Sequence, residues 1–509
     1  MESPEPASGL LAGYRGSFVI LLHGFLLASL VALGLLKQSL SLNADDCLYP
    51  VSLLLFATVL WCVLSWRLMG HALLSAYMLF FLSAALFNGA QCALEVFRLN
   101  QNGMLDGQFS SETLVETTYL VCLGMAFFHC GALSGAAGRE RESGTATGAE
   151  REKAVRAAGY IFVAISFIPA CLVMSQDVSV VMTTGYTGLF GRDMAVGFKA
   201  APRILSSLLV PGALYVLAGS RGRSKTIGLL VLLVLSVSAV YLFMGARGGA
   251  AMAVTAFLWL YHQRIRRLNR SVLIAVAAAF LVLFPVIAII RTTAGEWRLS
   301  LDEVARQVEQ SNAPLPVAAL SEMGRSMSTV AYTLDLVPAV RAFDYGLSYA
   351  YGLLGVVPNL GWDVHPAMAH SFLADWLIRT VDPGTAARGG GLGFSFIAEA
   401  YLNFGWSGAP LALAFIGWAL SRFFRWAESS ADPARKAVLA SFLSFFLLYA
   451  RGESASFVRA LAWYAFLPYL VVCLLSWRGD VQARRRNARG HAWMRAVTLA
   501  PALCARRPA

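Results

Sequence analysis

The segment GGGLGFSFIAEAYLNFGWSG, residues 389–408, places polar side chains at the start of an apolar stretch of membrane-spanning length. Ser395, Glu399 and Asn403 recur every four residues, so on a helix they form one polar stripe. Inserting a carboxylate into a membrane helix costs about 2.5–3.5 kcal/mol, which makes Glu399 a candidate functional residue and a candidate general base. The alternative is that the stripe only hydrogen-bonds a neighbouring helix.

Arginines next to apolar runs are the candidates for binding an anion. The guanidinium group offers five donors in a planar fork that matches phosphate bidentately. Glycines flank one of these arginines on both sides, so a ligand could approach the backbone closely, and a helix beginning there would direct free N–H groups at it. The alternative is ordinary snorkelling of arginine at the membrane interface. The four candidates are Arg247, Arg291, Arg451 and Arg459.

Further acid–base candidates lie in the second half of the chain. His370 and Asp375 occur together in AHSFLADWL and are the next candidate bases after Glu399. Glu322 is a supporting residue, as is Asn403. Glu453 stands two residues from Arg451, so we expect it to pair with that arginine and orient it.

The composition indicates an all-α, polytopic membrane protein. Hydrophobic residues make up 58% of the chain and charged residues 14%, against about 25% charged residues in soluble domains. The mean hydropathy is +0.62. Because about 20 apolar residues span a bilayer as a helix, we expect about twelve spans, the first of them retained rather than cleaved. They lie near residues 17–36, 48–66, 71–94, 113–136, 157–175, 203–219, 226–244, 248–262, 271–290, 394–421, 437–450 and 459–477.

The basic residues predict the orientation, because short cytoplasmic loops collect Lys and Arg. With twelve spans, five clusters of basic residues fall on one side of the membrane, and both termini are cytoplasmic. The clusters lie within residues 139–156, 221–225, 264–270 and 422–436 and in the tail from Arg478. This predicts transmembrane helices 1–9 in residues 1–290, a large, partly helical periplasmic loop in 291–393, helices 10–12 in 394–477 and a basic cytoplasmic tail in 478–509. The candidate arginines and acid–base residues then share the periplasmic side.

Several classes of function are disfavoured. The net charge of +12 resides in inter-helix loops and the tail without a stacking-aromatic platform, so we expect no nucleic-acid partner. Eight cysteines lie mostly in apolar runs without a CxxC or Cys/His cluster, so we predict no disulfide and no metal site. No phosphate-binding loop of the GxxxxGK[ST] type is present, and we expect no cofactor.

At these residues the chain resembles the O-antigen polymerases (Wzy-type), which polymerise oligosaccharide repeat units. The resemblance rests on FMGARGGAA at 243–251, on SEMGRSMSTVAYTLDLVP followed by YGLSY within 321–349, on residues 389–408 and on RGESASFVR at 451–459. It implies a GT-C-type glycosyltransferase in the bacterial inner membrane that joins undecaprenyl-diphosphate-linked oligosaccharides at the outer face. The positions matched to the family are Arg247, Glu322, Glu399, Arg451 and Arg459.

Other functions remain open at this point. An O-antigen ligase would use the same donor with a lipid A-core acceptor. A transporter or flippase of the lipid-linked oligosaccharide would need a polar path through the helices, and the charged residues instead cluster near the outer ends of the predicted spans. A purely structural membrane subunit is the third alternative. The lipid bilayer and lipid-linked oligosaccharides are the expected partners, with a chain-length regulator and a flippase as further candidates.

Overall fold

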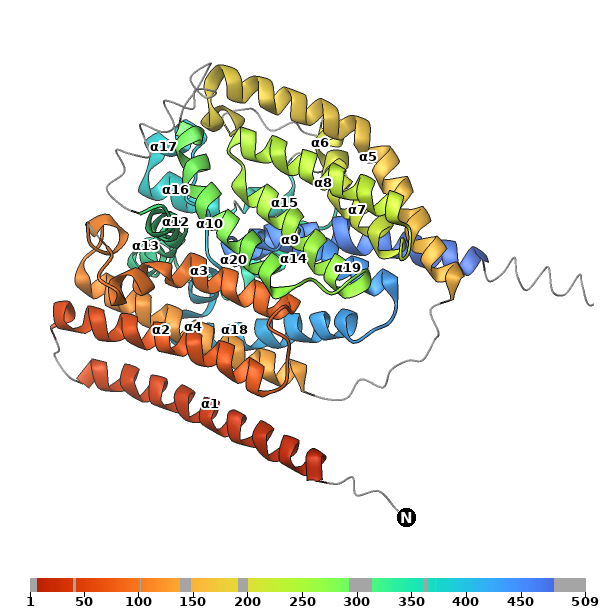
Figure 1. Ribbon diagram of the computed structural model, residues 1–509. Helices are drawn as coiled ribbons and strands as arrows, with labels where there is room; N and C mark the ends of the chain where they lie inside the picture. Colours follow the sequence, from red (N-terminus) through yellow and green to blue (C-terminus); the bar gives the residue numbers. More distant parts are fainter. Residues whose placement is uncertain are drawn as a thin grey trace, which may run out of the picture.

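The computed structural model describes residues 7–39, 43–100, 102–137, 148–190, 200–292, 314–359, 362, 364–370 and 372–479, and every regular element in these residues is a helix (Figure 1). The long helices run roughly side by side. They are α1 (Ala7–Ser39), α2 (Ala44–Leu68), α3 (Ala76–Val96), α4 (Ser111–Ala136), α5 (Ala149–Thr184), α8 (Ser224–Met244), α9 (Arg247–Arg264), α10 (Arg270–Thr292) and α18 (Phe396–Glu428). The side chain of Arg291 and the tail after Gly479 lie outside what the structure describes.

Within the described residues, ten helices are long and apolar enough to cross a membrane, against about twelve that we predicted. Eight are helices given above, all but α9. The ninth is α6 (Ala201–Ser206) with α7 (Leu209–Ala218), and the tenth is Ser454–Gly479, which begins as α21 (Ser454–Ala460) and continues through the π-helix η6 (Leu461–Phe466).

The two predicted runs that are not among these ten, 248–262 and 437–450, are helical nonetheless. The first is α9, and the second is divided between α19 (Pro433–Leu443) and α20 (Leu447–Ala450). Every residue from Ala437 to Leu443 is buried. A helix surrounded by other helices is solvated by protein rather than by lipid, so it can be shorter and less apolar than a lipid-facing span.

The core of the bundle is the contact between α4 and α18. A Cβ atom added to Gly131 would lie 1.7 Å from the carbonyl oxygen of Ala414, and one added to Gly417 would lie 2.0 Å from that of Phe128. The two backbones therefore touch where both helices carry glycine, which is how membrane helices approach closely.

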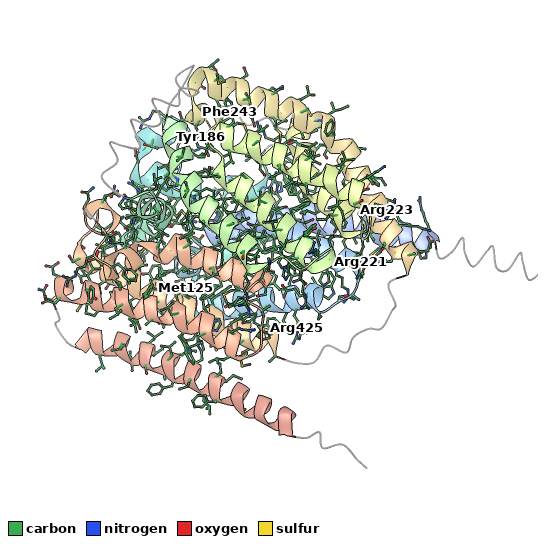
Figure 2. The ribbon with its side chains drawn as sticks, in the orientation of Figure 1. Met125, Tyr186, Arg221, Arg223, Phe243 and Arg425 are labelled. Carbon is green, nitrogen blue, oxygen red and sulfur yellow. The ribbon has the colours of Figure 1, made fainter. Side chains whose placement is uncertain are left out.

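One end of the bundle gathers residues from the basic loops. Arg151 donates to Asp432 (3.0 Å) and to Ser476, Arg264 pairs with Glu152 (2.7 Å), and Arg156 donates to the carbonyl of Gly219. We call this the basic end. Figure 2 shows Arg221, Arg223 and Arg425 toward one end of the molecule and Phe243 and Tyr186 toward the other.

The segment predicted as a large loop is folded onto the opposite end. Its described part contains short helices: α12 (Leu315–Gly324), α13 (Ser328–Leu336), α14 (Leu347–Leu354), α15 (Pro366–Ala369), α16 (Leu373–Val381) and α17 (Pro383–Ala387). Gln91 of α3 donates to the carbonyl of Ser321, and Thr113 of α4 donates to Asp335. These contacts hold the segment against the ends of the long helices.

Candidate functional site

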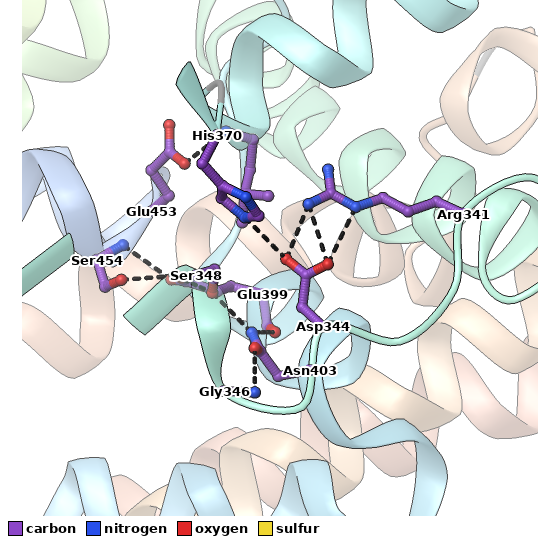
Figure 3. A network of polar contacts seen from close by, with 10 residues as sticks. Arg341, Asp344, Gly346, Ser348, His370, Glu399, Asn403, Glu453 and Ser454 are labelled. Carbon is purple, nitrogen blue, oxygen red and sulfur yellow. Dashed lines mark hydrogen bonds and ion pairs between the residues drawn. The ribbon is translucent and has the colours of Figure 1, made fainter. Parts of the chain in front are cut away.

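A buried hydrogen-bond network connects Glu399 and Asn403 of α18 with two serines from distant segments (Figure 3). Glu399 is 1% exposed. One of its carboxylate oxygens accepts from the hydroxyls of Ser348 (2.9 Å) and Ser454 (2.6 Å), and the other accepts from the backbone N–H of Ser454 (2.8 Å). Asn403 donates to Ser348 Oγ over 2.7 Å. The carboxylate therefore ties α14, α18 and the start of α21 together.

A kink in α18 at Gly405 gives this network its shape. Gly405 has φ 60° and ψ −163°, which interrupts the helical hydrogen bonds. The carbonyls of Leu402 and Asn403 instead accept from the backbone N–H groups of Asp344 (3.0 Å) and Tyr345 (3.1 Å). The side-chain oxygen of Asn403 accepts from Gly346 N–H over 2.8 Å. Residues 344–346 are thus fixed on the kink.

Asp344 belongs to a second, more accessible group of charged side chains beside this network. Arg341 donates to both of its carboxylate oxygens (2.8–3.2 Å) and also lies over the ring of Trp376. His370 Nε2 lies 3.4 Å from Asp344 Oδ2, near enough for an ion pair but without a hydrogen bond (Figure 3). The ring of His370 stacks on Tyr351 at 4.3 Å. The His370 side chain is 21% exposed, the most of the three, although its Nε2 atom is itself buried.

Glu453 caps the helix that follows His370. Its carboxylate accepts from the backbone N–H groups of Leu373 (2.6 Å) and Ala374 (3.5 Å) in the first turn of α16. Burial raises the pKa of Glu453 to about 7, although the Leu373 hydrogen bond favours the charged form. We expected Glu453 to pair with Arg451 and orient it, which stays a prediction, whereas these contacts tie Glu453 to the start of α16. Asp375 lies exposed in the same first turn.

The candidate arginines occupy two different places. Arg247 begins α9 after the left-handed Gly245, and its guanidinium group donates to both carboxylate oxygens of Glu322, another of the five positions matched to the family. It also donates to the carbonyl of Phe284 over 2.8 Å. Arg451, two residues before Glu453, lies over the ring of Phe87 at 5.2 Å, and Arg459 is exposed on α21.

Sequence reasoning joined Ser395 to the polar stripe and missed four other residues. Ser395 caps α18 and donates to Asn88 of α3 (2.7 Å), so it faces a different helix from Glu399. The missed residues are Arg341, Asp344, Ser348 and Ser454. Ser348 and Ser454 lie in YGLSY and RGESASFVR, two of the stretches that carry the family resemblance, whereas nothing in the sequence singled out the other two.

One group of possible metal ligands occurs in the described residues, although we predicted no metal site. His23, Cys62 and His129 have their ligand atoms within 4.8 Å of one another, all buried. Both nitrogens of each ring already have hydrogen-bond partners: His23 contacts Ala126 and Trp61, and His129 contacts Ser65 and Tyr77. A chain of hydrogen bonds between helices accounts for this cluster without an ion.

An all-helical body with ten candidate spans defines a multi-pass membrane protein, and the polar site at one end is where its chemistry can occur. The model of the O-antigen polysaccharide polymerase Wzy family matches residues 18–478. The chain therefore belongs to the Wzy family, whose members polymerise lipid-linked O-antigen repeat units in lipopolysaccharide biosynthesis, and the resemblance inferred from its motifs is confirmed. Comparisons with curated proteins and with solved structures found no match.

Proposed function

We propose that this polymerase joins undecaprenyl-diphosphate-linked repeat units at the periplasmic face of the bacterial inner membrane, with both termini cytoplasmic. The observation that carries this proposal is the position of the Glu399–Asp344–His370 region at the end of the bundle opposite the basic end. The basic end collects residues from loops that the positive-inside rule assigns to the cytoplasm. The polar region then faces the periplasm.

Two buried helices support twelve crossings and a GT-C-type arrangement. Arg264, near the end of α9, contacts Glu152 at the basic end, while Arg247, at its start, contacts Glu322 at the other. The 18 residues of α9 are about 27 Å long at 1.5 Å per residue, close to the thickness of the hydrocarbon layer. Likewise, α19 begins beside Asp432 at the basic end, and the carbonyl of Ala450, the last residue of α20, accepts from Asn88 of α3.

The proposed reaction is displacement of diphosphate by a sugar hydroxyl. The acceptor oxygen forms a bond to the anomeric carbon of the donor as the bond from that carbon to the diphosphate oxygen breaks. The leaving diphosphate takes the electron pair, and the acceptor proton passes to a base. Arg451 and Arg459, with Arg247 and Arg291 as further candidates, would stabilise the charge that develops on the diphosphate.

The contacts favour His370 as the base and Glu399 as a positioning residue. Glu399 is 1% exposed and already accepts three hydrogen bonds, so a sugar hydroxyl would have to displace a serine to reach it. The His370 side chain is 21% exposed, and its Nε2, buried without a hydrogen bond, lies 3.4 Å from the Asp344 carboxylate. Asp375 is exposed and is the alternative base.

The glycans of cells that lack this chain test the function. Glycans limited to a single repeat unit, restored to a ladder by the wild-type chain, are the expected result. Intact polymer retained on undecaprenyl diphosphate would identify a ligase instead. Loss of all glycan from the periplasmic side would identify a flippase.

A further inference from the structure

The helix α14 has its polar and apolar faces reversed relative to a helix on a water-facing surface. Its buried face carries Ser348 and Gly352, which pack against the start of α21. Its exposed face carries Leu347, Ala350 and Leu353, with Leu347 52% and Leu353 64% exposed. These three residues are spaced by three, so they lie on one side of the helix. We call them the α14 apolar face.

The surroundings of the α14 apolar face are also apolar. Tyr345, just before the helix, and Val357, just after it, are both exposed, and the sequence from Tyr345 to Trp362 contains no charged residue. Exposed apolar surface of this kind in a protein indicates a contact with another apolar phase or molecule. The segment lies outside the ten candidate spans, so spanning a membrane does not explain it.

The helix α14 lies beside exposed apolar side chains of α18. Tyr349 of α14 stacks on Phe404 of α18 with ring centres 6.2 Å apart. Phe404, just before the kink at Gly405, is 39% exposed, and Leu411 and Phe415, beyond the kink, are exposed on the same span. The spacing of four places Leu411 and Phe415 on one face of the helix. A bilayer that covers Phe404 as well as Leu411 and Phe415 therefore meets α14.

We propose that α14 is a membrane-contacting helix whose apolar face lies in the acyl region of the leaflet beside the site. Ser348, on the opposite face of the same helix, hydrogen-bonds Glu399 and Asn403, so the polar network lies one helix width from lipid. If the proposed function holds, a lipid-linked sugar then reaches the site sideways from the bilayer, with its diphosphate at the membrane surface. The membrane contact itself does not depend on that reaction.

Nitroxide labels in lipid vesicles test the membrane contact directly. A label is placed at Leu353→Cys in a chain whose native cysteines are replaced and which still restores polymer in cells. The vesicles contain phosphatidylethanolamine and phosphatidylglycerol. Collisions with oxygen, which dissolves in lipid, are compared with collisions with a water-soluble nickel chelate. Labels at Leu411→Cys on α18 and Ala387→Cys on α17 are the lipid-facing and water-facing controls.

We expect the label at residue 353 to match the one at 411, with frequent oxygen collisions and few nickel collisions. A label at 353 that matches the one at 387 would overturn the proposal, because the face would then be in water. Protection of residue 353 from both reagents would also overturn it, since protein or a bound polyprenyl chain would then cover the face. The readout is independent of polymerisation, so failure of the proposed function would leave a lipid-like signal unchanged.

A charge on the α14 apolar face supplies a second measurement. Leu353→Asp should move the label at Ala350→Cys from lipid-like toward water-like collisions, while Leu353→Ala should leave it lipid-like. An unchanged lipid-like signal in the Asp variant would contradict a position in the acyl region, where a carboxylate is strongly disfavoured.

Discussion

Asp344 Oδ2 lies 3.4 Å from His370 Nε2, and the two residues come from different parts of the segment that the sequence presented only as a long external loop. Arg341 fixes Asp344 through both carboxylate oxygens, and Tyr351 stacks on the imidazole. His370 is therefore positioned between Tyr351 and a fixed carboxylate, and a positioned histidine is the side chain that most often acts as a general base.

His370→Ala should reduce the rate of polymerisation by about 100-fold or more, because positioned general bases typically contribute 10²–10⁴-fold. Asp344→Asn should cause a smaller loss, since the base remains but loses its charged neighbour. The measurement is conversion of purified lipid-linked repeat units by the enzyme in vesicles. Asp375→Asn is the matched control and should retain activity. An active His370→Ala enzyme with an inactive Asp375→Asn enzyme would reverse the two assignments.

Glu399→Ala should lower stability more than Glu399→Gln does. The alanine variant leaves the hydroxyl and N–H of Ser454 and the hydroxyl of Ser348 without their acceptor, at a cost of about 1–3 kcal/mol for each buried donor. Thermal unfolding in detergent measures the difference, and lipid-linked substrate binding is measured in parallel. A Gln variant of normal stability that binds substrate without turning it over would make Glu399 the base instead.

Arg247→Ala and Glu322→Ala should both destabilise the fold, by about 1.5–3 kcal/mol, because hydrogen bonds to charged groups contribute that much. If Arg247 also binds diphosphate, only the arginine variant should lose affinity for the lipid-linked donor. Arg247→Lys should rescue poorly, since lysine cannot make the bidentate contact. Equal donor affinity in the two alanine variants would leave Arg247 with a structural role only.

Glu453 should make the stability of the fold depend on pH. A carboxyl group with a raised pKa in the folded chain binds protons preferentially in the fold, so its contribution is present below about pH 4.5 and is lost as the pH rises through about 7. Glu453→Gln keeps an oxygen for the N–H of Leu373 and removes the titration. Its melting temperature should therefore fall less than that of the wild type across this window. Parallel curves for the two proteins would contradict the prediction.

Reporter fusions test the orientation and the number of crossings. Fusions after residues 150 and 485 should be cytoplasmic, and one near residue 340 should be periplasmic. Fusions after residues 246 and 267 should fall on opposite sides, periplasmic and cytoplasmic, because α9 connects the two ends of the bundle. Identical signals from this last pair would mean that α9 does not cross.

The sequence alone determined the class of the protein, most of the spans and the helix that carries Glu399 and Asn403. These features are local, because the length of an apolar run and the spacing of polar residues are set within one helix. The predicted count of about twelve stays open at α9 and at α19–α20, which are not among the ten long apolar helices of the described residues and where burial among other helices relaxes the need for apolar residues.

Only the tertiary structure decided which groups meet. Ser348 and Ser454 reach Glu399 because α14 and α21 pack against α18, and Asp344 is in place because the kink at Gly405 leaves two carbonyls for residues 344 and 345. The guanidinium group of Arg247, which we predicted from the sequence to bind a diphosphate, forms an ion pair with Glu322 in the fold. Contacts between residues so far apart in the chain depend on how the helices pack, and the local pattern of residue types does not determine that packing.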